Sequence, residues 1–352
     1  MQDWLDQHAD ITALRLAVAD LNGQARGKRL PRQFSGKVFD GGTRLPFSTL
    51  NVDLLGQDID DSPLVFDSGD ADGLLVPTER GFIPMPWLDT PTAMLPMGMF
   101  HPDNTAFDGD PRHALHRVLE RYTLHHLTPV SAIEMEFYLI DTSGPAPQIP
   151  CVPGTAYRHA VPDTLSISAL DDFDGFLTDL YAACKAMDIP ADAAFSESGV
   201  GQFEINLLHC DDALRTADYA WLFKIAAKGL ARKLGFTASF MAKPYPDSAG
   251  SGMHSHFSVL DAEGRNIFDD SSPNGSETLR HAVAMSRPKS ASVMEATMTA
   301  VTPTPTWSAW VIGAAGWKLR VTAGFPGLQH GLQPGLQRGA DAHRARRHVH
   351  EA

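Results

Sequence analysis

The chain has 352 residues, 43% of them hydrophobic, and a formal net charge of −13 at pH 7. This length exceeds one ordinary domain, so we expect a small domain beside a larger one, with enough apolar residues for a real core. The negative charge argues against a surface for nucleic acid or an anionic membrane, and it is compatible with a cationic ligand.

The amino-terminal segment and the cysteines both favour a cytoplasmic protein. The first ten residues are acidic and lack the basic and apolar regions of a signal peptide. No apolar run approaches the about 20 residues that a membrane helix needs, so we expect no membrane partner. The cysteine spacing fits neither a disulfide framework nor a zinc site, which predicts free thiols. The cysteines are Cys151, Cys184 and Cys210.

The first hundred residues begin with a predicted hairpin over residues 12–30. Apolar residues alternate before Asn22-Gly23, the strongest two-residue turn signal. The basic cluster on the return strand is either a solvated edge or a surface near phosphate or a neighbouring subunit. Residues 84–103 carry five prolines, which predicts an irregular connection between elements.

Three helices are expected further along the chain. The first opens at Asp110-Pro111 and runs through about residue 126, with Leu115 and Val118 on its inner face. The others cover about residues 170–188 and 211–234. These helices alternate with strand-like segments, which favours an α+β fold whose antiparallel sheet is flanked by helices.

Three of the strand-like segments place possible metal ligands two residues apart or beside a tight turn. Apolar residues alternate with Glu134 and Glu136, with Glu204, and with His254 and His256, so each strand has a core face and a polar face. In one sheet these polar faces would converge. Crowded carboxylates repel unless cations lie between them, and oxygen-rich sites with some imidazole suit Mg²⁺ or Mn²⁺. The pattern therefore predicts two or more divalent ions.

Each motif alone also has a simpler interpretation. A single Glu-x-Glu is usually a solvated sheet face, and His-x-His can be a polar strand face. The glycine-rich segment 197–204 can be an ordinary hairpin. All three occur together and in this order, which favours the metal site.

These segments carry a resemblance to the glutamine synthetase family, and within it to the glutamylpolyamine synthetase branch. Glu134-Met135-Glu136 resembles the family's Glu-x-Glu strand, and residues 197–204 resemble its Glu-x-Gly-x-Gly-Gln-x-Glu segment. Lys243-Pro244, followed by residues 250–256, resembles its Gly-Ser-Gly-Met-His-x-His region. The resemblance runs from about residue 10 to about residue 284.

The resemblance implies roles for particular residues. Ligands of one ion, close to the amino acid and the amine, would be Glu136, Glu197 and Glu204. Glu134 and His254 would hold a second ion on the phosphates of ATP. His256 and Ser258 match positions that contact ATP, and Gly250 matches the loop that holds glutamate. This chain has Ala249 before that glycine, where the family's first enzymes have Asn.

The resemblance also implies a domain plan and an assembly. Residues 1–100 would form a small β-grasp-like domain that closes the active site of an adjacent subunit in a ring-forming homo-oligomer. Residues 101–284 would be a truncated catalytic domain. Residues 285–352 have three acidic side chains against eight Lys and Arg, and they lack the family's expected arginine motifs. A frameshift, a gene-model error or a diverged domain would each explain this aberrant segment.

Three functions compete at this level. The first is an ATP-dependent ligase that joins ammonia, an amine or a polyamine to the γ-carboxylate of glutamate through a γ-glutamyl phosphate. The second is an impaired remnant that binds metal or nucleotide without turnover, because the missing arginines would leave the transferred phosphoryl charge unbalanced. The third, a metal-dependent hydrolase, would not need the ATP-contacting positions.

Overall fold

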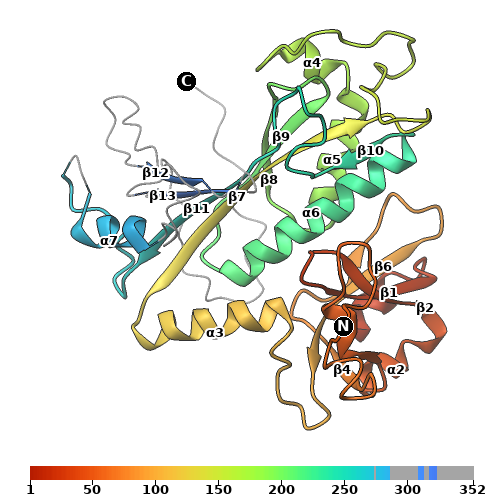
Figure 1. Ribbon diagram of the computed structural model, residues 1–352. Helices are drawn as coiled ribbons and strands as arrows, with labels where there is room; N and C mark the ends of the chain where they lie inside the picture. Colours follow the sequence, from red (N-terminus) through yellow and green to blue (C-terminus); the bar gives the residue numbers. More distant parts are fainter. Residues whose placement is uncertain (273–274, 286–307, 313–316, 323–352) are drawn as a thin grey trace, which may run out of the picture.

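The computed structural model describes residues 1–272, 275–285, 308–312 and 317–322. Two β-sheets, each accompanied by helices, make up these residues (Figure 1). The predicted α+β class is confirmed.

The first sheet is built from residues 13–100. Its strand order is β2-β1-β6-β4-β3, with β5 paired to β6. The bounds are β1 Ala13–Ala19, β2 Ala25–Pro31, β3 Arg44–Pro46, β4 Asp72–Pro77, β5 Ile83–Pro84 and β6 Thr92–Phe100. Short helical segments flank it: α1 Gln2–Gln7, η1 Arg32–Phe34, α2 Gly36–Phe39 and η2 Phe47–Leu50.

The predicted hairpin at residues 12–30 is confirmed. Strands β1 and β2 pair antiparallel, and Gly23 lies in the turn with a φ of 69°, a conformation that glycine adopts without steric cost. The buried carboxylate of Asp20 accepts bonds from the backbone of Asn22 and Gln24 and from Arg26, at 2.8 Å in each case. The turn is therefore fixed by one carboxylate.

The prediction of an irregular connection over residues 84–103 is wrong. Strand β6 occupies the middle of this range, between β1 and β4, and all of its residues except Phe100 are buried. Pro96 is tolerated because the pairing of β6 with β1 ends there, at the register pair Ala17–Pro96, where a missing N–H matters least. The carbonyl of Pro96 still accepts a hydrogen bond from the backbone N–H of Thr78. The continuous apolar run was the stronger signal.

The second sheet carries the polar faces predicted from the sequence. Its order is β12-β13-β11-β7-β9-β8, with β10 paired to β7. All described pairings are antiparallel except that of β11 with β13. The bounds are β7 Thr128–Ile140, β8 Ala191–Ser196, β9 Gln202–Leu207, β10 Thr237–Ser239, β11 Met253–Leu260, β12 Ser308–Ile312 and β13 Trp317–Thr322.

The three predicted helices are present. They are α3 Pro111–Leu124, α5 Asp174–Ala186 and α6 Ala213–Lys233, with α4 Ile167–Asp171 and α7 Glu277–Met285 in addition. Asp110 caps α3 by accepting a bond from Arg112 N. The inner face predicted for α3 is partly wrong, because Val118 is exposed and α3 buries no residue fully. No described helix is both long enough and apolar enough to cross a membrane.

The two sheets are joined through α6. A side chain at Gly229 would collide with Trp87, which enters the core of the second sheet. Arg112 pairs with Asp218 on α6 at 3.1 Å and also with Glu79. The proposed division at residue 100 stays a prediction, and the aberrant segment 285–352 lies outside the described residues apart from the end of α7 and the backbone of β12 and β13.

Candidate metal centre

The predicted ligands converge because β7 lies between β11 and β9. In the antiparallel register, Glu134 faces His254 on β11, and Glu136 faces Glu204 on β9. Directly opposed residues of neighbouring strands have adjacent side chains. The pairing therefore brings together residues that are up to 120 positions apart in the sequence.

The alternation of the strands separates the core from the site. Met135, Phe137 and Leu139 are buried in one hydrophobic cluster with Phe203 of β9 and Phe223 of α6. Because successive strand residues point to opposite faces, the glutamates point away from this core. The predicted core face and polar face of these strands are both confirmed.

His254 is at the centre of the polar face. Its Nδ1 lies 2.7 Å from Oε2 of Glu134 and 3.7 Å from Oε2 of Glu204, and its Nε2 lies 3.6 Å from Oε1 of Glu136. The side chains of these four residues are 11–17% exposed. Three carboxylates thus share one imidazole in a largely enclosed space.

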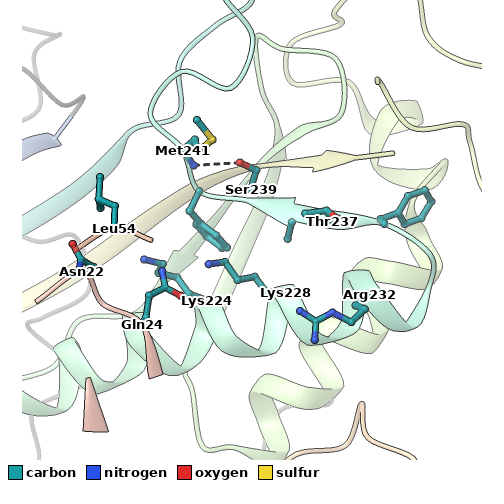
Figure 2. A pocket seen from close by; sticks show the side chains of 12 residues that line it. Asn22, Gln24, Leu54, Lys224, Lys228, Arg232, Thr237, Ser239 and Met241 are labelled. Carbon is teal, nitrogen blue, oxygen red and sulfur yellow. Dashed lines mark hydrogen bonds between the residues drawn. The ribbon is translucent and has the colours of Figure 1, made fainter. Parts of the chain in front are cut away.

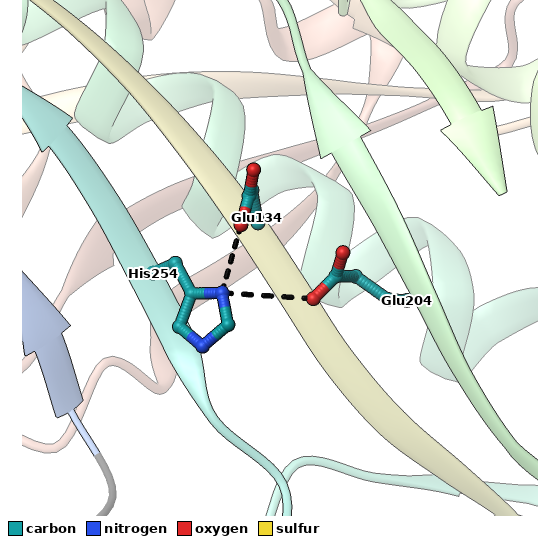
Figure 3. Close-up of side chains that lie close together, drawn as sticks. All are labelled: Glu134, Glu204 and His254. Atoms are coloured by element: carbon teal, nitrogen blue, oxygen red, sulfur yellow. Dashed lines mark hydrogen bonds and ion pairs between the residues drawn. The ribbon is translucent and has the colours of Figure 1, made fainter. Parts of the chain in front are cut away.

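Donor atoms of Glu134, Glu204 and His254 all lie within 4.8 Å of one another (Figure 3). Each comes from a different strand, and Figure 3 shows the imidazole of His254 directed at both carboxylates. Glu136 borders this group through its contact with His254. Glu197 lies outside it, on the connection from β8 to β9, where its backbone N–H donates to the carbonyl of Gln202.

Glu136 is fixed by residues to which the sequence assigned no role. Its Oε2 accepts a bond from Gly252 N at 2.8 Å and another from Gln202 Nε2 at 3.1 Å. Gln202 also donates to the carbonyl of Gly250. Gln202 and Glu204 are two residues apart and therefore lie on the same face of β9. The period of two in the sequence thus already placed Gln202 beside the predicted ligands.

The surroundings of Glu134 favour its charged form. Burial works to raise the pKa of this carboxyl, but the hydrogen bonds from His254 and His256 outweigh burial, so the pKa lies well below its usual value. A third imidazole, that of His209, packs edge-on against the ring of His256, with 6.1 Å between the ring centroids. Burial and the neighbouring His256 lower the pKa of His209 to about 4, so it is neutral at pH 7.

The donor set and the local space fit a divalent cation. Carboxylate oxygens with one imidazole nitrogen suit Mg²⁺ or Mn²⁺. A Cβ at Gly252 would lie 3.0 Å from Oε1 of Glu136 and 3.2 Å from Nε2 of His254. A side chain there would crowd the ligand atoms, and glycine leaves that space open.

The residues predicted to contact ATP and glutamate lie beside this cluster. Nε2 of His256 is 2.7 Å from Oε1 of Glu134. Ser258, two residues further along β11, is fully buried. Gly250 presents its carbonyl to Gln202, and the carbonyl of Ala249 accepts a bond from Tyr138 at 2.7 Å. Their roles toward ligands stay predictions.

Comparison with known proteins finds glutamine synthetases and related glutamate–amine ligases. The family described as glutamine synthetase, catalytic domain, matches residues 108–300. Gamma-glutamylputrescine synthetase PuuA of Escherichia coli (strain K12) is 34% identical over 284 residues, which cover 80% of this chain and 60% of that protein. Glutamate–isopropylamine ligase of a Pseudomonas species is 30% identical over 278 residues, covering 76% and 58%.

Solved structures show the same fold. The structure described as "Apo GmaS without ligand" superposes with a TM-score of 0.65 at 25% identity, covering 80% of this chain and 64% of that one. A glutamine synthase homolog superposes with a TM-score of 0.66 at 22% identity, covering 78% and 62%. The chain spans about three fifths of the length of the PuuA enzyme and of the isopropylamine ligase.

Proposed function

Since this chain belongs to the glutamine synthetase family, we propose that it is an ATP-dependent ligase that forms an amide on the γ-carboxylate of glutamate. The nitrogen donor is ammonia or an amine, including a polyamine, and the intermediate is a γ-glutamyl phosphate. The observation that carries the proposal is the convergence of Glu134, Glu204 and His254 from three adjacent strands.

The residues of the sheet would hold two or more divalent ions. Glu136, Glu197 and Glu204 would bind one ion, and Glu134 and His254 would bind the other. Bound there, Mg²⁺ or Mn²⁺ would offset the negative charge of the phosphates and of the attacking carboxylate during phosphoryl transfer. Gln202 and the backbone of Gly252 keep Glu136 in place for this role.

The polar face would also serve the nitrogen donor. An amine must lose a proton before it attacks an acyl phosphate, and a carboxylate-lined pocket attracts the protonated amine first. The contacts to ATP through His256 and Ser258, and to glutamate through the loop at Gly250, belong to the same proposal. A cytoplasmic, ring-forming homo-oligomer is the assembly that we expect, and its mass in solution is the direct test.

The activity is tested by ADP release from purified protein with ATP, glutamate and Mg²⁺. Ammonia, putrescine and isopropylamine are supplied one at a time as nitrogen donors. We expect release that requires both glutamate and a nitrogen donor. Glu204→Gln should abolish it, and Glu263→Gln should not, because Glu263 is exposed on a loop. Equal ADP release with and without glutamate would refute the ligase.

A second candidate is an impaired family member that binds metal or nucleotide without turnover. Residues 285–352 favour this candidate, because their sequence lacks the arginine motifs that the family resemblance leads us to expect. The test compares ADP release by this chain with release by a version in which the reading frame is restored near residue 285. Much faster turnover by the restored version supports impairment, whereas equal turnover by the two shows that the segment is functional.

A further inference from the structure

A pocket lies on the helix side of the second sheet and is not part of the metal centre. Its volume is about 540 Å³. The walls come from the β1–β2 turn, from Leu54, from α6 and from β10 with the residues that follow it (Figure 2). The ring of Phe240 in its wall packs in a tilted arrangement against Phe137, which belongs to the core face of β7, with 5.3 Å between the ring centroids. The sheet therefore separates this pocket from the glutamates.

Three cations from one helix line the pocket. Lys224, Lys228 and Arg232 occur at intervals of four residues on α6, so they lie on the same face of the helix. Figure 2 shows all three side chains on the side of α6 that faces β10. A rise of about 1.5 Å per residue spreads these positions over about 12 Å. The pocket thus presents a row of positive charges.

This row has no carboxylate partner among the residues that the structure describes. The lining includes no Asp or Glu. Lys224 and Lys228 lie over the ring of Phe240, at 5.7 and 5.9 Å. Asp20 is the acidic group that acts on Lys224 from nearby, and its carboxylate is already bound to Arg26 and to the turn backbone. The positive charge is therefore largely uncompensated.

The surroundings of the two lysines disfavour their charged forms. Burial lowers the pKa of Lys224 and of Lys228, and the neighbouring cation lowers each further. Burying a cation is unfavourable unless an anion pairs with it, so a bound anion would stabilise this cluster. The other walls offer the amide of Gln24 and apolar surface from Leu54 and Phe240, which suits a ligand with a carbon skeleton.

We propose that this pocket is a binding site for a small polyanion, whose phosphate or carboxylate groups pair with Lys224, Lys228 and Arg232. The volume and the 12 Å row fit a ligand with at least two separated anionic groups. A single small ion would pair with only part of the row. The site lies apart from the metal centre, so its occupation does not depend on the proposed ligase activity.

The test is calorimetry on the full chain in buffer freed of divalent metal, at fixed ionic strength. The probes are inorganic pyrophosphate and citrate, which distinguish phosphate from carboxylate chemistry. We expect saturable binding of at least one probe. Lys224→Gln/Lys228→Gln should weaken it by about tenfold or more per lysine removed, because hydrogen bonds to charged groups are lost.

Two variants control the experiment. Lys233→Gln removes an exposed cation from the same helix outside the pocket, and it should leave the affinity unchanged. Glu134→Gln/Glu136→Gln alters the metal centre and should also leave the affinity unchanged. The proposal is overturned if neither probe saturates the wild-type chain, if the two-lysine variant binds equally well, or if Lys233→Gln weakens binding as much.

Discussion

His254 and Glu134 face each other across β11 and β7, with Nδ1 of the imidazole 2.7 Å from Oε2 of the carboxylate. His254 also contacts Glu136, which lies on β7 with Glu134, and Glu204, which lies on β9. One imidazole on β11 thus links two carboxylates of β7 with one of β9, and His254 lies 50 or more residues along the chain from each of them. The consequences for metal binding can be measured directly.

Glu136→Ala is expected to remove one of two Mn²⁺ sites. Glu136 is proposed as a ligand of one ion and Glu134 of the other, so titration calorimetry should show the stoichiometry falling from two ions to one. Glu120→Ala is the matched control, because that carboxylate is exposed on α3 and pairs with His116. An unchanged stoichiometry in Glu136→Ala would remove Glu136 from the ligand set.

ATP binding should require a divalent ion. The carboxylates around His254 repel phosphates unless cations lie between the two. In a fluorescence titration with a labelled nucleotide, chelation of Mg²⁺ or Mn²⁺ should reduce the affinity by about tenfold or more. His256→Ala should weaken binding in the presence of the metal. Equal affinity before and after chelation would count against nucleotide binding at this face.

Arg112→Met should destabilise the contact between the two sheets. Asp218 is buried, and without Arg112 its charge has lost its main partner, a change that costs about 3–5 kcal/mol in comparable sites. Urea unfolding measures this loss. Arg117→Met is the control, because Arg117 pairs at the surface with Asp108, and such pairs contribute about 0–1 kcal/mol.

The loss in Arg112→Met should depend on pH. Burial raises the pKa of Asp218 above the usual 3.8, and Arg112 opposes that rise. Removing Arg112 raises the folded-state pKa further, so the folded variant binds a proton more readily than the unfolded chain. The defect should therefore be largest at neutral pH and should shrink as pH falls through that pKa. A defect of constant size down to pH 4 would contradict this account.

Cys184 should resist alkylation in the folded protein. Burial raises the pKa of its thiol to about 12, so almost no thiolate forms at pH 8. Mass spectrometry after iodoacetamide treatment should find label at the partly exposed Cys151 and, more slowly because burial also raises the pKa of its thiol, at Cys210. Cys184 should be labelled only after unfolding in urea. Rapid labelling of Cys184 in the native protein would contradict its burial in the core.

The sequence by itself determined the local features of this protein. The period of two assigned Glu134, Glu136, Glu204 and His254 to one face of their strands, because side-chain direction in a strand alternates whatever the rest of the fold does. Turn and cap chemistry likewise placed the hairpin at Asn22-Gly23 and the start of α3 at Asp110-Pro111. These signals depend on neighbours in the chain.

Only the tertiary structure decided which faces meet. The register of β7 with β11 and β9 placed His254 among three carboxylates, left Glu197 outside the closest group, and gave Gln202 and Gly252 the task of holding Glu136. Strand β6 is buried despite its proline, and α6 brings Lys224, Lys228 and Arg232 to one pocket on the helix side of the second sheet. Such contacts join residues that are distant in the sequence. Their stabilising free energy comes from side-chain packing and strand pairing, which a local sequence pattern does not specify.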